Sequence, residues 1–217
     1  NKVYGDNPNK VKMVELETRW EFKGDLFKKG ISEKMSIDHA SHSLFGVSKV
    51  SADLMVQEYG RFHKIPTCCL RGGCLTGPSH SGVELHGFLN YLIRCGIANE
   101  KYTIFGYKGK QVRDNIHSFD VAKFIFEFVK NPKIAAVYNI GGGYENSISM
   151  KEAIKKVEAL TNIKLHYEYD DKSRFGDHIC YYSDLDAIKK DFPNWKVTKS
   201  LDFIFEDVFK TLKDNWK

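Results

Sequence analysis

The apolar positions between residues 43 and 62 recur at intervals of three and four, which predicts an amphipathic helix with one side buried. Ile65 to Arg71 is a short apolar run after a turn signal and predicts a buried strand. A glycine-rich loop from Arg71 to Pro78 follows it. The apolar positions of the predicted helix are Leu44, Val47, Val50, Leu54, Met55 and Tyr59.

The rest of the chain mixes predicted strands and helices without an internal repeat. Ser149 and Glu152 have the spacing of a capping box for a helix that runs to about Leu160. Residues 6–42 carry Pro8, Gly24, Gly30 and many charges around a short apolar stretch, and an irregular segment of this length predicts either a functional lid or a misassigned element. We expect strands at 102–105, 112–116, 137–140 and 164–169, and helices at 83–97, 121–129 with Ser118 as its cap, 184–190 and 201–216.

The composition indicates a globular protein and excludes several function classes. Of 217 residues, 42% are hydrophobic and 13% aromatic, which suits one large domain or one domain and part of another. The formal charge of +5 comes without a long basic run, so no nucleic-acid arm is predicted. No apolar run approaches the roughly 20 residues of a membrane span. The five cysteines have no Cys-x-x-Cys spacing, so we expect a soluble protein of the reducing cytoplasm that binds no metal, nucleic acid or membrane.

Phe45 and Lys49 lie four residues apart, so both side chains project from one face of the predicted helix. With tyrosine at 45, the pair would be the Tyr-x-x-x-Lys of the short-chain dehydrogenase/reductase superfamily. The chain resembles the extended branch of that superfamily, the NAD-dependent nucleotide-sugar epimerases and dehydratases, and within it the CDP-paratose 2-epimerase group. The matching segments occur in the family's order at Asn1–Gly5, Phe45–Lys49, Arg71–Pro78, Gly109–His117, Tyr138–Gly143 and Arg174–His178.

The resemblance implies an α/β fold that holds the second half of a Rossmann-type doubly wound parallel sheet and a smaller α/β substrate-binding domain. Residues 1–78 are then expected in the NAD-binding domain and 79–217 mainly in the nucleotide-sugar-binding domain, with segments near 113–140 returning to the sheet. No glycine-rich turn of the dinucleotide-binding type joins a strand to a helix, so we expect a carboxy-terminal fragment. In the family the helix at 43–62 packs against its twin, which implies a homodimer or homotetramer; a core helix is the alternative.

The resemblance also implies catalytic roles. In the family the lysine holds the nicotinamide ribose of NAD and lowers the pKa of the tyrosine, whose phenolate takes a proton from a substrate hydroxyl. Phe45 cannot exchange a proton, so Lys49 is expected to keep its role while the base is missing. His42, one turn earlier, is a candidate replacement, because histidine side chains exchange protons near neutral pH; an exposed or capping histidine is the alternative.

Further residues are implied around the two ligands. Arg113 is expected to grip a diphosphate oxygen, which its planar fork suits, and pairing with Asp114 is the alternative. Cys74 is expected beside NAD, with a buried structural thiol as the alternative. The full expectation places Lys49, Arg71, Gly72, Gly73 and Cys74 at the cofactor and Thr76, Arg113, Arg174 and Asp177 at the substrate.

Together these implications give an NAD-dependent epimerase that acts at C2 of a CDP-linked dideoxyhexose through a transient keto sugar. Two alternatives stay open. One is a 4-epimerase or 4,6-dehydratase of a UDP or dTDP sugar, and the other is a non-catalytic nucleotide-sugar-binding protein, because Phe45 replaces the tyrosine. The fragment alone is expected to be inactive, since the cofactor's pyrophosphate would meet the missing half.

Overall fold

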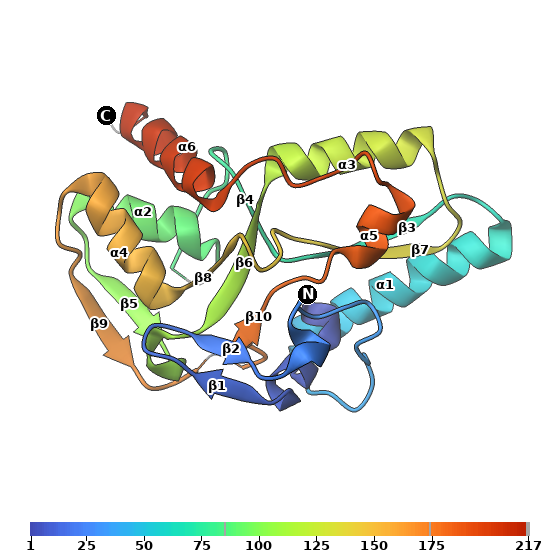
Figure 1. Cartoon of the computed structure of the whole chain (residues 1–217), viewed down its shortest axis with the longest axis horizontal. Helices are drawn as coiled ribbons and strands as arrows, with labels where there is room; N and C mark the ends of the chain where they lie inside the picture. The colour runs from blue at the N-terminus through green and yellow to red at the C-terminus, as the bar shows by residue number, and fades with distance from the viewer. Residues whose placement is uncertain (85, 174, 216–217) are drawn as a thin grey trace.

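The computed structural model describes residues 1–84, 86–173 and 175–215 and shows an α/β arrangement (Figure 1). The helices are α1 (Ser43–His63), α2 (Phe88–Ala98), α3 (Ser118–Lys130), α4 (Met150–Thr161), α5 (Asp186–Asp191) and α6 (Leu201–Asp214). The strands are β1 (Met13–Glu15), β2 (Trp20–Phe22), β3 (Cys68–Gly72), β4 (Cys74–Thr76), β5 (Tyr102–Phe105), β6 (Val112–His117), β7 (Ala136–Ile140), β8 (Ser147–Ser149), β9 (Tyr167–Asp170) and β10 (Cys180–Tyr181). Short 3₁₀ helices cover Lys2–Tyr4, Asn7–Lys10, Asp25–Phe27 and Tyr107–Gly109.

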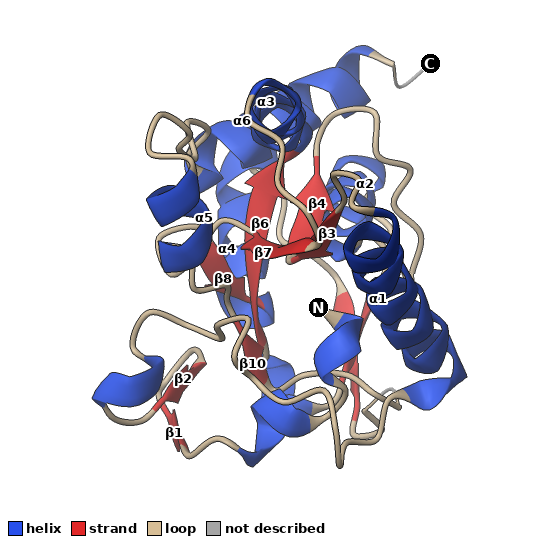
Figure 2. Ribbon diagram, turned by 90° about the vertical axis from the view of Figure 1, so that its right-hand side faces the viewer, coloured by secondary structure: helices blue, strands red, loops and turns tan. Residues whose placement is uncertain are grey.

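Strands β3 and β7 form a parallel pair, in register from Cys68 opposite Ala136 onward. Helix α1 lies on one side of this pair and α3 on the other (Figures 1 and 2). Under α3 the ring of Phe124 meets those of Phe192 and Trp195 edge-on, with centroids 5.1 and 5.7 Å apart. A parallel pair covered by helices on both faces is the arrangement expected of an α/β fold.

Strand β6 is the centre of a second sheet. It pairs in parallel with β4 and β10 and antiparallel with β8. Its buried polar residues are held by specific partners: His117 accepts a hydrogen bond from the backbone N–H of Phe119 at Nδ1, and its Nε2 lies 3.1 Å from Asp207 of α6. These contacts fix β6 between α3 and α6, and with it the side chains that β6 carries.

Helices α2, α4 and α6 pack together beside the parallel pair β5–β9. Their shared core includes Leu92, Val157 and Phe205, all fully buried. At Gly96 of α2 an added Cβ would lie 2.5 Å from Val157 Cγ1, so α2 and α4 can approach this closely only with glycine there.

Residues 6–42 contain the antiparallel hairpin β1–β2, which is attached to the rest of the protein. Thr18 accepts a hydrogen bond from Ser149 Oγ (2.7 Å) at its carbonyl and donates one from Oγ1 to Glu152 (2.7 Å). The backbone N–H of Trp20 donates to the carbonyl of Lys110 (3.0 Å). The segment predicted as irregular therefore contains regular elements, while its function as a lid stays a prediction.

Several predicted boundaries differ from the structure. Helix α2 begins at Phe88 and not at 83, because reciprocal backbone hydrogen bonds between Val83 and His86 close a turn and Gly87 adopts a left-handed φ of 73°. Leu85, within the predicted helix, lies outside the described residues, as do residues 216–217. Helix α3 is capped by His117 and not by Ser118.

Other predictions are confirmed. Strand β5 has the predicted bounds, and the loop predicted at 71–78 contains the short β4. The capping box is complete, since Ser149 Oγ accepts from the Glu152 N–H (3.1 Å) and the Glu152 carboxylate accepts from the Ser149 N–H (2.9 Å).

The apolar side of α1 is exposed within this chain, which contradicts the alternative of a core helix. Leu44 and Met55 are 92% and 72% exposed, whereas the helix buries Asp53, Gln57 and its glycines. At Gly60 an added Cβ would lie 2.1 Å from Thr67 Oγ1, so the small and polar side of α1 faces the segment of this chain that leads into β3. Packing against a second copy stays a prediction. No described helix is long and apolar enough to cross a membrane.

Candidate active site

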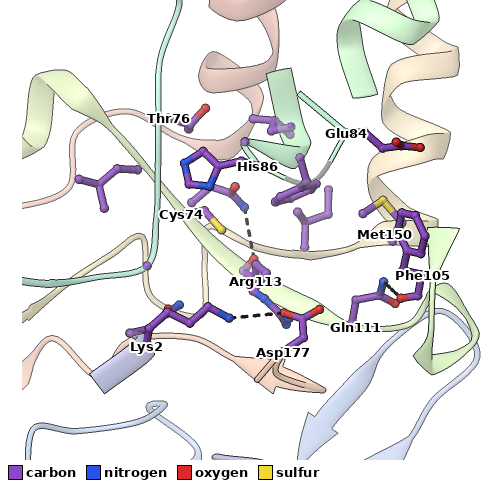
Figure 3. A pocket seen from close by; sticks show the side chains of 18 of the residues that line it. Lys2, Cys74, Thr76, Glu84, His86, Phe105, Gln111, Arg113, Met150 and Asp177 are labelled. Atoms are coloured by element: carbon purple, nitrogen blue, oxygen red, sulfur yellow. Dashed lines mark hydrogen bonds and ion pairs between the residues drawn. The ribbon is translucent and has the colours of Figure 1, made fainter. Parts of the chain in front are cut away.

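A cavity of about 750 Å³ lies between the amino-terminal turn, the start of α1, the β4–α2 loop and strands β5 and β6. Its volume is in the range of small-molecule sites. The wall combines aromatic side chains such as Phe45 and Phe105 with polar side chains such as Gln111 and Arg113 (Figure 3). Gln111 is buried and donates to the carbonyl of Phe105 (3.1 Å), which joins β6 to the end of β5.

One corner of the cavity is cationic. Nη2 of Arg113 donates to Asp177 Oδ1 (2.6 Å) and to the carbonyl of His178 (2.5 Å), and the Lys2 ammonium lies 3.8 Å from Asp177 (Figure 3). His178 donates from Nε2 to the carbonyl of Gly5 (2.8 Å), and burial together with the Arg113 charge lowers the pKa of His178 to about 3, so it is neutral at pH 7. Two cations face one carboxylate here, which leaves a net positive charge suited to an anionic ligand.

Asp114 does not pair with Arg113, which overturns the alternative weighed from the sequence. Successive side chains of a strand point to opposite faces, so Asp114 points away from the cavity. Its carboxylate accepts from the N–H groups of Gly143 (3.2 Å) and Ser183 (3.0 Å), and burial raises the pKa of Asp114. An added Cβ at Gly73 would lie 2.3 Å from that carboxylate, so Asp114 shapes the cavity wall from behind.

Phe45 and Lys49 share a helix face, as their spacing predicts. The Lys49 ammonium lies 5.1 Å from the centroid of the Phe45 ring. Phe45 lines the cavity, whereas Lys49 is exposed and is not among the lining residues, and its ammonium makes no hydrogen bond or ion pair with a described residue.

His42 is not among the residues that line the cavity. Its Nε2 lies 2.8 Å from the carbonyl of Ile37 and its Nδ1 3.5 Å from that of Lys2, so both ring nitrogens face backbone oxygens. The structure thus gives His42 a local anchoring contact and does not aim it at a ligand in place of the missing phenol.

The residues expected at the cofactor divide into two groups. Gly73 and Cys74 line the cavity, and burial raises the pKa of the Cys74 thiol to about 11, so it is uncharged. Arg71 and Gly72 do not line it. Arg71 is buried in an ion pair with Asp53, which its position in the predicted loop did not indicate.

Of the residues expected at the substrate, Thr76, Arg113 and Asp177 line the cavity. Thr76 donates from Oγ1 to the side-chain carbonyl of Asn90 (2.8 Å), so its hydroxyl is already engaged. Arg174 lies outside the described residues.

Sequence reasoning missed Lys2, His80 and Gln111. Gln111 precedes the arginine of β6, and His80 belongs to the loop that joins β4 to α2. For His80 a signal was available, because it follows the carboxyl end of the parallel strand β4, where α/β folds bind ligands. Lys2 lies in a 3₁₀ helix and Gln111 precedes the amino end of β6, so neither position carried that signal. No group of three or more potential metal ligands occurs among residues 1–84, 86–173 and 175–215.

A parallel α/β sheet with helices on both faces, open at a cavity that carries cations and aromatic rings, defines a ligand-binding protein of the Rossmann type. Residues 21–141 match the NAD dependent epimerase/dehydratase family, and the chain belongs to this family.

Curated relatives and solved structures agree with this assignment. CDP-paratose 2-epimerase of Salmonella typhi is 33% identical over 77% of this chain and 50% of the relative. A dTDP-glucose 4,6-dehydratase of Escherichia coli is 24% identical over 97% of this chain and 54% of the relative. The chain spans about half the length of these curated relatives.

The structure of UDP-glucuronic acid 4-epimerase from Bacillus cereus, in complex with UDP-glucuronic acid and NAD, has the same fold. The two structures align with a TM-score of 0.75 at 22% identity, over 93% of this chain and 60% of that one. The fold class predicted from the sequence is confirmed, and NAD is the cofactor of the family.

The donor chemistry of Lys49 suits a ribose diol of NAD. Its exposed ammonium has three N–H donors and makes no hydrogen bond or ion pair with a described residue. The domain boundaries at residue 78 stay a prediction.

Proposed function

We propose that the whole protein is an NAD-dependent epimerase that acts at C2 of a CDP-linked dideoxyhexose. The observation that carries the proposal is that Arg113 and Phe45 line one cavity. A ligand held at Arg113 through its diphosphate therefore has its sugar within the same enclosure as the face shared by Phe45 and Lys49. The 33% identity to CDP-paratose 2-epimerase supports the choice of base, sugar and carbon.

In the proposed reaction each residue has a limited task. Arg113 and Lys2 bind the diphosphate, and Asp177 holds the Arg113 fork in place. Lys49 orients the ribose of NAD, which supplies a reversible hydride acceptor. The hydride of C2 would pass to bound NAD and the proton of the sugar hydroxyl to a water molecule, and both would return after the opposite face is presented, so the reaction has no net redox change. Phe45 packs in the wall and exchanges no proton.

A second candidate is a non-catalytic protein that binds nucleotide sugars. Phe45 favours it, because the phenol is absent and His42 turns its nitrogens to backbone oxygens. The 24% identity to a dTDP-glucose 4,6-dehydratase over 97% of this chain supports the third candidate, which acts on a UDP or dTDP sugar.

The decisive experiment incubates the NAD-loaded whole protein with CDP-paratose and follows the sugar by NMR, beside a Phe45→Tyr variant. Because general-base catalysis contributes about 10²- to 10⁴-fold, we expect slow epimerisation by the natural protein and a rise of that order in the variant. Turnover by the Phe45→Tyr variant alone would identify the natural protein as a non-catalytic binder of nucleotide sugars. Turnover of dTDP-glucose or UDP-glucose, with CDP-paratose unchanged in both proteins, refutes the proposed substrate.

We further propose that the whole protein is a cytoplasmic homodimer or homotetramer that assembles through the exposed apolar side of α1. The exposure of Leu44, Met55 and Phe62 supports this, because a row of large apolar side chains in water is unusual for a helix that stays unpartnered.

A further inference from the structure

The imidazole of His80 is held in one orientation at the cavity wall. The loop that carries it is closed by reciprocal backbone hydrogen bonds between Val83 and His86 (2.8 and 2.9 Å). The His80 ring lies against Gly87, where an added Cβ would come within 2.8 Å of Cε1 and 2.9 Å of Nε2. The ring of His86 meets it edge-on, with centroids 5.8 Å apart. The ring therefore has little freedom to rotate.

The two nitrogens of this ring differ in their surroundings. Nδ1 is enclosed and has no hydrogen-bond partner among the described residues. The side chain as a whole is half-buried and lines the cavity, so Nε2 is the nitrogen that a ligand can meet. Burial and the neighbouring His86 lower the pKa of His80 from 6.5, so the ring is neutral at pH 7 and carries one N–H.

The enclosure of Nδ1 decides which nitrogen holds the proton. An N–H enclosed without an acceptor loses its hydrogen bonds to water, which is unfavourable. The tautomer with the proton on Nε2 avoids an enclosed donor and points its N–H into the cavity. His80 therefore presents an uncharged donor, in contrast to the cations Arg113 and Lys2 at the other polar corner.

We propose that His80 is a specificity-determining residue that donates a hydrogen bond from Nε2 to a hydroxyl or keto oxygen of the bound sugar. This inference rests on the proposed function, in that the ligand is a nucleotide sugar. The diphosphate is matched by the charges of Arg113 and Lys2, whereas a neutral donor suits an uncharged oxygen. A sugar without that oxygen would leave the donor unpaired, and this is how a polar site rejects an analogue.

Isothermal titration of the NAD-loaded whole protein with CDP and with CDP-paratose tests the assignment. In His80→Ala we expect CDP-paratose to bind about 3- to 10-fold more weakly, the value of one neutral hydrogen bond, and CDP to bind within about twofold of the natural protein. His80→Gln keeps an N–H donor and should recover part of the loss. His63→Ala, an exposed histidine of α1 that does not line the cavity, is the matched control and should bind both ligands normally.

The outcomes separate this inference from the proposed function. If the natural protein binds neither CDP nor CDP-paratose, the proposed function fails and the role of His80 fails with it. If both ligands bind and His80→Ala weakens them equally, or weakens neither, the nucleotide-sugar binding that the proposed function requires stands and the role of His80 is refuted. Nitrogen-15 NMR of the histidine-labelled protein at pH 7 adds a readout that needs no turnover. The signals of His80 are identified as those missing from the spectrum of His80→Gln. In the natural protein their chemical shifts should show a proton on Nε2, and a proton on Nδ1 would overturn the assignment.

Discussion

The ion pair between Arg71 and Asp53 provides a test of whether Arg71 serves the cofactor or the fold. Nε and Nη2 of Arg71 each donate to one carboxylate oxygen of Asp53 at 2.9 Å, and both side chains are only 6% exposed. Nη1 lies 3.4 Å from the Tyr4 hydroxyl, and the guanidinium lies over the Tyr4 ring. The pair connects α1, β3 and the amino-terminal turn, so its loss should weaken all three.

The perturbation is Arg71→Met, which keeps much of the side-chain volume and removes the charge. Removing one partner of a buried pair leaves the other charge unpaired and costs about 3–5 kcal/mol. For a chain of this size each kcal/mol lowers Tm by about 2–4 °C, so we expect a fall of roughly 6–20 °C. The double variant Arg71→Met with Asp53→Leu removes both charges and should recover most of that loss. Arg61→Met, which removes an exposed arginine from α1, should change Tm by less than about 2 °C.

Calorimetric unfolding of each variant without NAD gives the Tm, and titration with NAD gives the affinity. A structural role predicts the fall in Tm in the absence of the cofactor. If Arg71→Met keeps its Tm and instead binds NAD much more weakly, the argument from burial is refuted and the role implied by the resemblance is restored.

Two further predictions concern α4 and α1. Ser149→Ala removes the capping box and the hydrogen bond to Thr18, so it should lower the free energy of unfolding by about 1–2 kcal/mol in a denaturant titration. An unchanged midpoint of unfolding would contradict the stabilising role of the cap. Met55→Glu places a charge on the exposed apolar side of α1 and should shift sedimentation toward the monomer, whereas Val129→Glu, on the exposed side of α3, serves as the control. A dimer that survives Met55→Glu unchanged argues against assembly through α1.

Local patterns predicted the elements whose stability is local. The capping box of α4 depends on residues three apart, and the spacing of Phe45 and Lys49 is set by the helix itself. The start of α2 was misplaced because the apolar period continues through the Val83–His86 turn, where Gly87 takes a left-handed conformation that the period does not register. The apolar period of α1 predicted a helix correctly but carried no information on whether that side is covered within one chain.

The site was harder to predict because its contacts join distant segments. Alternation along β6 already places Arg113 and Asp114 on opposite faces, so their mutual pairing was avoidable from the sequence. The partner of Arg113 is Asp177, which follows a different strand, so this pair could be identified only from the three-dimensional structure. The same holds for Asp53, whose buried carboxylate is neutralised by Arg71 of the distant strand β3 and also accepts a hydrogen bond from Gln57 of its own helix.

The strand pairings described above have a consequence for the order in which the chain folds. In β3–β7, β5–β9 and β6–β10 the partners are Cys68 with Ala136, Tyr102 with Tyr167, and Val112 with Cys180, all far apart along the chain. Each pairing must bear the entropy cost of closing a long loop before its contacts stabilise the chain, and such topologies fold slowly. The hairpin β1–β2 and the helices can form early. The contact between Arg113 and Asp177 can form only after the last third of the chain has folded onto β6. Ligand-binding capacity should therefore appear late in refolding, after most of the helical signal has been recovered.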